Sequence, residues 1–338
     1  MRRLLTPARL AAVALVAATG LAFLYVFPSD DYLYLPDRAR PLAPLVRIED
    51  ERPPSDAGGI YYVSVSVRRA TLLESLLPGI YDGSEKVSKD EVREPGESDE
   101  EHRRAVLGEM RRSQRVAAAV ALRELGRDVR IRATGVVVTA VVADAPAGPK
   151  LRAGDVILAV DGKPTRMVSR LRSAIRRHPP GTRVRLRIRR DRSTRDFALR
   201  TIADPRRPGE SIIGIGVSQA AQIRLPIDVD INLGDVGGPS AGLAFALDIF
   251  EELGRDVDHG RRIAATGEIF LDGTIGPVGG LRQKTIGARR AGVDLFLVPA
   301  GENTAEARRY AEGLRVEPVK SFRQALQLLA TLPAKTSR

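Results

Sequence analysis

The first strong pattern in the chain is an uncharged apolar run from Leu10 to Phe27, with Arg2, Arg3 and Arg9 before it. A helix needs about 17–25 apolar residues to cross a bilayer, whereas a signal-peptide core is usually shorter, at about 7–15 residues. We therefore expect residues 1–28 to form a cytoplasmic stub and an uncleaved transmembrane anchor. Because basic residues favour the cytoplasmic side, the rest of the chain would lie on the outer side of the membrane.

The next segment, residues 29–57, is rich in proline and charge and has no period, so the pattern predicts an extended stalk. Residues 58–125 begin with a β-rich run, Ile60–Val67, continue through a charged loop and end in a helical pattern over Arg103–Leu125. We expect this region to join the C-terminal domain through its first strand.

Residues 126–205 alternate in the way that short strands do. Gly135–Val142 is rich in valine, and the stretch from Gly154 ends at a tight Asp161-Gly162 turn. A helical segment over Met167–Arg177 and an alternating strand over Arg183–Ile188 follow. This order predicts a small β-rich domain.

The phrase from Leu151 to Gly162, followed by a helix, Pro-Gly and a strand, resembles a PDZ domain. PDZ domains bind a peptide as an added strand, so the resemblance implies a groove between Val136–Val142 and the Met167–Arg177 helix. The peptide-binding candidates that it implies are Thr134, Gly135, Val136 and Val137. A packing domain without a ligand remains the alternative.

Ser240 lies where an alternating strand pattern, ending at Ile231, gives way to an amphipathic helix that begins near Leu243. Gly237, Gly238 and Pro239 predict a turn between the two. Free N–H groups at a helix start stabilise a developing oxyanion, so Ser240 is a candidate nucleophile. Serine is also a good helix N-cap, and this alternative remains open.

A serine nucleophile needs a base, and none of the three histidines has an evident acidic orienter. Lys284 is the other candidate, because it falls in the first turn of a predicted helix over Leu281–Ala291. The helix dipole and apolar surroundings both lower the pKa of a lysine there. A surface lysine near a helix start is the alternative.

These segments together resemble the proteolytic domain of Lon-type peptidases over about Ile212 to Leu332. That resemblance implies Ser240 as nucleophile, Lys284 as base and Thr266 as a residue that orients the lysine, with Gly238, Pro239 and Ala241 in support. The whole chain resembles bacterial membrane-anchored PDZ-containing Lon-like proteases, which implies a single-pass cell-membrane protein with an extracytoplasmic catalytic domain. The residues that carry the resemblance are Gly238–Gly242, Thr266–Ile269, Gly276–Gly280 with Lys284, Ala291–Val293 and Leu297–Pro299.

The amino-acid composition excludes several other functions. The chain has no cysteine, which excludes disulfides and a cysteine nucleophile, and we expect no metal site and no cofactor. Its net charge of +12 is carried mostly by arginines without interleaved aromatic residues, so we expect no nucleic-acid partner. No Gly-x-x-x-x-Gly-Lys-Ser/Thr phosphate loop occurs, which predicts ATP-independent action.

The sequence thus predicts an α+β protein with an N-terminal transmembrane helix. A PDZ-like module, residues 126–205, would be inserted before or within a Lon-type proteolytic domain, residues 206–334. The expected function is serine endopeptidase action on peptide or unfolded-protein substrates, at the cell membrane and in a homo-oligomer. The alternatives are a catalytically silent PDZ-type peptide-binding scaffold and an envelope protein that binds anionic polymers.

Overall fold

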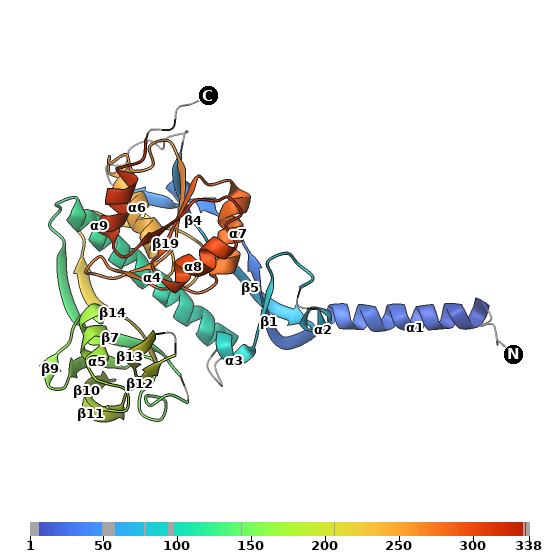
Figure 1. The fold of residues 1–338 in the computed structure, drawn as a ribbon, viewed down its shortest axis with the longest axis horizontal. Coiled ribbons are helices and arrows are strands. Elements are labelled where there is room, and N and C mark those ends of the chain that lie inside the picture. Colours follow the sequence, from blue (N-terminus) through green and yellow to red (C-terminus); the bar gives the residue numbers. More distant parts are fainter. Residues whose placement is uncertain are drawn as a thin grey trace.

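The computed structural model describes residues 7–48, 58–77, 79–93, 98–142, 144–205, 207–333 and 335. Helix α1 (Pro7–Val26) projects from the body as a rod, with the N-terminus at its far end (Figure 1). The body is a mixed α+β structure. It contains three main sheets, which we name the β1 sheet, the β7 sheet and the β16 sheet after strands β1 (Pro28–Pro36), β7 (Arg130–Val141) and β16 (Arg262–Ala265).

The sequence predicted that the apolar run at the N-terminus spans a membrane. A span needs about 20 predominantly apolar residues, and the side chains that the structure describes in α1 begin at Ala11 and end at Val26. Among the described residues, no helix has the length and apolar character required to cross a membrane. The predicted transmembrane anchor, and the single-pass extracytoplasmic location that was derived from it, are therefore wrong.

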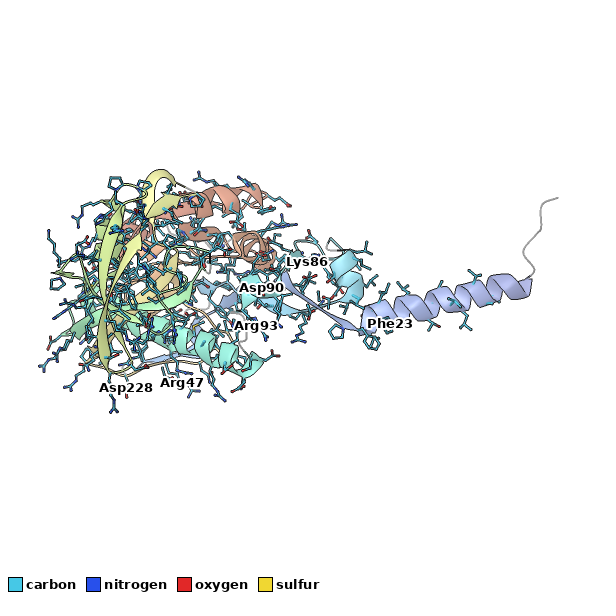
Figure 2. All side chains as sticks on the ribbon, turned by 90° about the horizontal axis from the view of Figure 1, so that it is seen from below. Phe23, Arg47, Lys86, Asp90, Arg93 and Asp228 are labelled. Atoms are coloured by element: carbon cyan, nitrogen blue, oxygen red, sulfur yellow. The ribbon has the colours of Figure 1, made fainter. Side chains whose placement is uncertain are left out.

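The β1 sheet connects α1 to the body. Strand β1 pairs antiparallel with β5 (Val65–Thr71) on one side and with β6 (Glu85–Val87) on the other. Tyr32 of β1 is buried, and the guanidinium of Arg93, just after helix α3 (Lys89–Val92), lies 5.1 Å from the centre of its ring. Figure 2 labels Arg93 near this sheet, away from Phe23 on α1.

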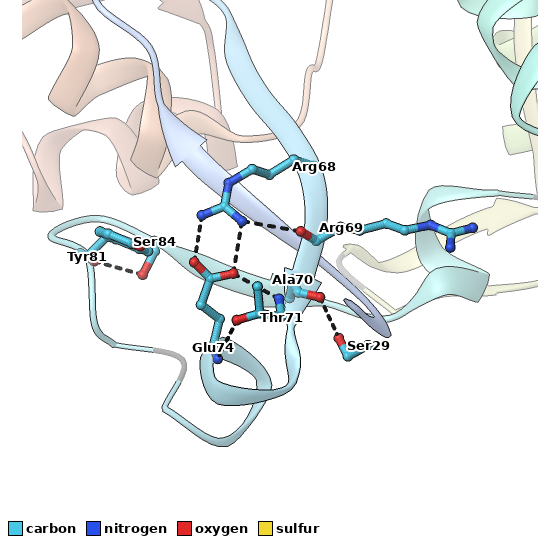
Figure 3. A network of polar contacts seen from close by, with 8 residues as sticks. All are labelled: Ser29, Arg68, Arg69, Ala70, Thr71, Glu74, Tyr81 and Ser84. Carbon is cyan, nitrogen blue, oxygen red and sulfur yellow. Dashed lines mark hydrogen bonds and ion pairs between the residues drawn. The ribbon is translucent and has the colours of Figure 1, made fainter. Parts of the chain in front are cut away.

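A capping box fixes the turn from β5 into helix α2 (Leu72–Leu76). The side chain of Thr71 accepts from the backbone N–H of Glu74, and the carboxylate of Glu74 accepts from the backbone N–H of Thr71. Arg68 also donates to this carboxylate at 2.6 and 2.8 Å (Figure 3). Glu74 is only 3% exposed, and its hydrogen bond with Arg68 lowers its pKa to about 2.

Most of the described residues that the sequence assigned to a stalk form regular structure. After β1 come β2 (Arg40–Pro41), the 3₁₀ helix η1 (Ala43–Leu45) and β3 (Val46–Ile48). Val46 and Ile48 are buried, and β3 pairs antiparallel with β15 (Val229–Ile231). The partner strand lies far along the chain, so the local pattern of prolines and charges did not reveal this pairing. Residues 49–57 lie outside the described part.

The β16 sheet is the framework of the C-terminal region. Its order is β2, β4 (Gly59–Tyr62), β16, β19 (Leu295–Pro299) and β20 (Val316–Val319), and the last four strands run parallel. Strand β19 is buried along its whole length, as is typical of parallel strands with both faces covered. Because β4 belongs to the β-rich run after Gly58, N-terminal residues complete a sheet that is otherwise C-terminal.

Helices cover both faces of the β16 sheet (Figure 1). Ile263 and Leu297 pack in a hydrophobic cluster with side chains of α4, α6 and α9, whereas Ala264 and Phe296 face the other way, toward α7 and α8. The alternation of side chains along each strand therefore separates two groups of helices. Their bounds are α4 (Asp99–Glu124), α6 (Gly242–Glu252), α7 (Leu281–Ala291), α8 (Glu302–Arg309) and α9 (Phe322–Leu329).

The β7 sheet lies at the side of the body opposite to α1 (Figure 1). Its order is β11, β10, β8, β7 and β14, with the short β9 beside β8. On β10, Val184, Leu186 and Ile188 are buried, and the arginines at the alternate positions from 183 to 189 are exposed. The other elements here are helix α5 (Val168–Arg176) and strands β8 (Val156–Val160), β9 (Lys163–Pro164), β10 (Arg183–Arg190), β11 (Ser193–Arg200), β12 (Ile202–Asp204), β13 (Arg207–Ile212) and β14 (Ile215–Arg224).

Candidate active site

Helix α4 holds the loop that carries Ser240. The N–H of Gly238 donates to the carbonyl of Val106 at 2.9 Å, and the hydroxyl of Ser113 donates to the carbonyl of Pro239 at 3.0 Å. A Cβ on Gly237 would come within 2.7 Å of the Val106 side chain, so the loop has no room for a larger residue there. Gly238 has a φ of +85°, which glycine adopts without strain.

The segment after β16 holds Ser240 from the other side. The backbone carbonyl of Ser240 accepts from the N–H of Gly267 at 2.7 Å and from the hydroxyl of Thr266 at 3.1 Å. Thr266 is fully buried. The resemblance implied that Thr266 orients the lysine, and the structure shows its hydroxyl bound to the serine backbone. Ser240 is thus fixed between α4 and the end of a core strand.

The start of α6 offers backbone donors beside Ser240. The N–H of Gly242 donates to the carbonyl of Pro239, and the N–H of Leu243 donates to the carbonyl of Gly267. Within the described residues, the N–H groups of Ser240 and Ala241 make no such bond. Two free donors at a helix start are the arrangement that stabilises an oxyanion.

Lys284 lies in the first turn of α7, and its backbone N–H donates to the carbonyl of Gly280 at 2.9 Å. Its side chain is only 4% exposed. Burial lowers its pKa from 10.5 to about 7, and the charge of Glu306 opposes that effect only in part. No carboxylate of the described residues forms an ion pair with this amine. A buried lysine with such a pKa is neutral in a large fraction of molecules at pH 7.

The β1 sheet and the segment after it support the helix of Lys284. The side-chain amide of Gln283 donates to the carbonyl of Gly83 at 3.2 Å and to the carboxylate of Glu85 at 3.0 Å. The N–H of Ala39 donates to the carbonyl of Gly287 at 3.2 Å. These contacts join residues about 200 to 250 positions apart in sequence, so no local signal could have revealed them.

Ser240 and Lys284 are brought to the C-terminal edge of the parallel strands. Thr266, which holds Ser240, directly follows β16, and the loop before α7 is bound through the N–H of Val278 to Asn303, shortly after β19. The structure describes both side chains, and the hydroxyl of Ser240 forms no hydrogen bond with the amine of Lys284. Hydrogen bonds between catalytic groups are often long before substrate binds.

The region that contains this site matches a known protein family. Residues 219–331 match the family described as the Lon protease (S16) C-terminal proteolytic domain. The matched region is similar to the serine-peptidase domain of Lon proteases. It contains the serine loop, the threonine and the buried lysine described above.

The curated relatives of this domain are themselves Lon proteases. "Lon protease 2" of Bacillus subtilis is 32% identical over 113 residues, which are 32% of this chain and 20% of that protein. "Lon protease homolog, mitochondrial" of Homo sapiens is 40% identical over 96 residues, or 27% of this chain and 10% of that protein. "Lon protease 1" of Sorangium cellulosum is 37% identical over 109 residues, or 29% and 13%. The chain spans about a fifth or less of the length of these relatives.

A second family match covers residues 119–201 and is described as a PDZ domain. Among solved structures, the PDZ domain of an SdrC-like protein from Listeria monocytogenes is 26% identical and covers 26% of this chain and 92% of that chain, at a TM-score of 0.25. A solved structure from Geobacillus thermodenitrificans is 34% identical and covers 25% of this chain and 98% of that chain, at a TM-score of 0.24. These TM-scores are too low to establish the fold, so the PDZ assignment depends on the family match.

The structure places the PDZ-like groove candidates inside the sheet. Val136 and Val137 pair with β14 on one side and with β8 on the other, and Gly135 pairs with Ala220. A peptide cannot be added as a strand at positions that already have partners on both sides. Thr134 lines a separate hollow on the outer face of the sheet.

A cavity of about 340 Å³ lies instead beside α5 and the start of β14. Leu171, Arg172 and Ile175 of α5 form one wall, and residues 211–217 form the other. The sequence Ile213-Gly-Ile-Gly-Val217 is the signal that could have identified this wall, because its glycines leave space beside an edge strand.

The β7 sheet and the serine loop meet through a short hairpin, for which the turn signal in the sequence is Asp272-Gly273. Phe270, next to β17 (Glu268–Ile269), is buried in the hydrophobic cluster of the β7 sheet, and Arg172 of α5 lies 4.9 Å from its ring centre. Burial raises the pKa of Glu268 to about 7, although Arg172 opposes this. The hairpin returns through β18 (Ile275–Gly276) to the loop before α7.

One acidic group could accept a cation. Carboxylate oxygens of Glu251, Asp256 and Asp258 lie within 4.8 Å of one another, and burial raises the pKa of Glu251 to about 7. Backbone N–H groups of residues 257, 258 and 260 already bind two of these carboxylates. Glu251 lies near the C-terminal end of α6, and the two aspartates lie in the loop after it.

Proposed function

We propose that this chain is a serine endopeptidase that hydrolyses peptide bonds through an acyl-enzyme, with Ser240 as the nucleophile and Lys284 as the general base. The observation that supports this best is the burial of the Lys284 amine, which brings its pKa to about 7 inside a Lon-type domain. A base with a pKa near the working pH accepts a proton and still returns it efficiently.

The proposed reaction begins when the hydroxyl oxygen of Ser240 attacks the substrate carbonyl carbon and its proton passes to the Lys284 amine. The N–H groups of Ser240 and Ala241 donate to the resulting oxyanion. Collapse of this intermediate breaks the C–N bond, and Lys284 gives its proton to the leaving amine. A water molecule, deprotonated by the same lysine, then hydrolyses the acyl-enzyme.

The bonds to the Ser240 carbonyl support this mechanism. Thr266 and Gly267 fix the peptide plane of the nucleophile, and therefore the direction of the next N–H, that of Ala241. A donor that is already oriented costs no reorganisation when charge develops. We assign Thr266 to this positioning task.

We propose that the reaction of this chain does not depend on ATP, because its sequence contains no phosphate loop. Without a motor to unfold them, suitable substrates are peptides and loose segments of proteins. The apolar cavity beside α5 supports peptide binding by the PDZ-like module. We propose that this module comprises residues 126–205 and that the Lon-type domain comprises residues 206–334. Assembly into a homo-oligomer is part of the proposal, and light scattering tests it.

Cleavage of casein by the full chain without ATP tests the function. We expect cleavage by the natural protein and none by Ser240→Ala or Lys284→Met. Ser193→Ala and Lys320→Met change an exposed serine and an exposed lysine outside the site, and should cleave normally. Peptide binding without cleavage would favour the silent scaffold, and full activity of Lys284→Met would remove the lysine from the mechanism.

A further inference from the structure

The outer face of the β7 sheet contains a hollow of about 420 Å³, which we name the arginine cleft. It crosses three neighbouring strands, β7, β8 and β10, together with the turn around β9. None of the residues that line it is acidic. They are Arg132, Ala133, Thr134, Leu158, Ala159, Gly162, Pro164, Arg166, Arg187 and Arg189.

The four arginines of the cleft are exposed. Arg187 is paired with Asp196 of β11 at 2.9 Å. In the described part of the chain, the guanidinium groups of Arg132, Arg166 and Arg189 form no ion pair. Three unneutralised guanidinium groups around one hollow give it a strongly positive potential and leave their planar donors available to carboxylates.

Local backbone geometry explains why these side chains meet. On β10, the buried positions Leu186 and Ile188 place Arg187 and Arg189 on the outer face. On β7, the pairing with β14 shifts by one residue at Thr134, and bulges of this kind redirect side chains. The turn after β9 brings Arg166 to the same side.

The floor of the cleft indicates what kind of ligand it fits. Leu158, Ala159 and Pro164 present apolar surface between the arginines. A phosphate polymer has no apolar groups to cover this floor, whereas a peptide that alternates acidic and apolar side chains matches both parts. The outer strands β7 and β10 lie about 10 Å apart, which is the reach of about three extended residues.

We propose that the arginine cleft is a second peptide-binding site, which holds short acidic segments of the substrate and is separate from the cavity beside α5. This role depends on the proposed peptidase function, because the cleft would capture a substrate that Ser240 then cleaves. Its binding step does not depend on catalysis and is tested separately.

The first experiment measures fluorescence anisotropy of a labelled, end-capped Glu-Leu-Glu-Leu-Glu peptide on the full-length Ser240→Ala variant. We expect binding that weakens with salt, and weaker binding of the matched Gln-Leu-Gln-Leu-Gln peptide. The combined variant Arg132→Gln, Arg166→Gln and Arg189→Gln should lower affinity about tenfold, because each exposed charge pair contributes a few-fold.

A matched control makes the same change of charge elsewhere. Arg111, Arg255 and Arg309 are exposed and lie outside the β7 sheet. Replacing these three with Gln should leave affinity unchanged. An equal loss of affinity in both triple variants would mean that net charge alone attracts the peptide, and would overturn the proposal. An absence of peptide binding to the Ser240→Ala variant would also overturn it.

Two further measurements separate the remaining outcomes. Tripolyphosphate should compete only weakly, since it cannot cover the apolar floor. Tight, arginine-dependent binding of tripolyphosphate with no peptide binding would overturn the assignment to a peptide. In cleavage assays the cleft variant should raise KM for a substrate with an acidic segment and leave kcat unchanged. If neither the natural protein nor the cleft variant cleaves the substrate but the acidic peptide still binds, the proposed peptidase function is wrong. The proposal that the arginine cleft binds acidic peptides would then still hold.

Discussion

Replacing Lys284 with Met should make the protein more stable while it destroys activity. The buried amine has a pKa of about 7 in the folded state against 10.5 for an unperturbed lysine. At about 1.36 kcal/mol per pH unit, this difference in pKa corresponds to on the order of 5 kcal/mol. The charged lysine lowers the free energy of unfolding by that amount. Met has a similar length and no charge, so it fills the space without that cost.

The sign of the pH dependence follows from the lowered pKa. Between about pH 7 and 10.5 the unfolded chain holds more protons than the folded chain at this site, so the stability of the natural protein rises with pH. Below about pH 7 the destabilisation by the charged lysine is fully present, and above about pH 10.5 it is absent. The advantage of Lys284→Met should fall from about 5 kcal/mol at pH 6 to about 2 kcal/mol at pH 9.

Native-state hydrogen exchange measures this difference, because amides of the fully buried strand β19 exchange only when the domain opens. Comparing the variant with the natural protein at each pH cancels the other titrating groups. Lys320→Met, at an exposed lysine, should differ from the natural protein by less than about 0.5 kcal/mol. An advantage of zero, or one that stays constant from pH 6 to 9, would refute the buried neutral lysine.

Three other changes test separate parts of the structure. Thr266→Val removes one donor to the Ser240 carbonyl and should lower kcat about tenfold with little change in KM, as measured with a fluorogenic peptide; an unchanged kcat would contradict its positioning role. Glu74→Gln should lower the free energy of unfolding by on the order of 3 kcal/mol at pH 7, because the pKa of this carboxyl is lowered from 4.5 to about 2 in the folded state. The ionised carboxylate stabilises the fold above pH 4.5, and this stabilisation is lost as the pH falls to 2. Acid titration of exchange in the β1 sheet checks this, and an equally steep acid loss in the variant would disprove it. Phe270→Ala should destabilise the protein by about 3–5 kcal/mol in calorimetry, whereas Phe23→Ala, at an exposed ring, should not.

Local sequence patterns predicted some elements of the fold well. Alternation over Arg183–Ile188 predicted a strand with arginines on one face and a buried stripe on the other, and β10 has that form. The glycines before Ser240 predicted a turn into a helix, which begins at Gly242. Helical spacing predicted Leu281–Ala291, and α7 has those bounds. In each case residues within one element determine its structure.

The remaining features depend on contacts between residues far apart in the chain. The apolar run at the N-terminus forms a helix, but no helix of the described residues can span a membrane. The prolines and charges after it concealed β3, which forms because β15 supplies its partner. The same reason explains why the support of α7 by Gly83 and Ala39 was missed. The peptide groove was placed at β7 because strand order cannot be read from one sequence.

The most direct test of the proposed dyad is the rate at which a fluorophosphonate phosphonylates Ser240, with loss of fluoride, as a function of pH. We expect this rate to rise with pH through a single step near pH 7, since only the neutral Lys284 amine removes the serine proton. The step should be lost in Lys284→Met, with phosphonylation reduced to a trace. A rate that rises only above about pH 9, or a normal profile in Lys284→Met, would rule out Lys284 as the general base.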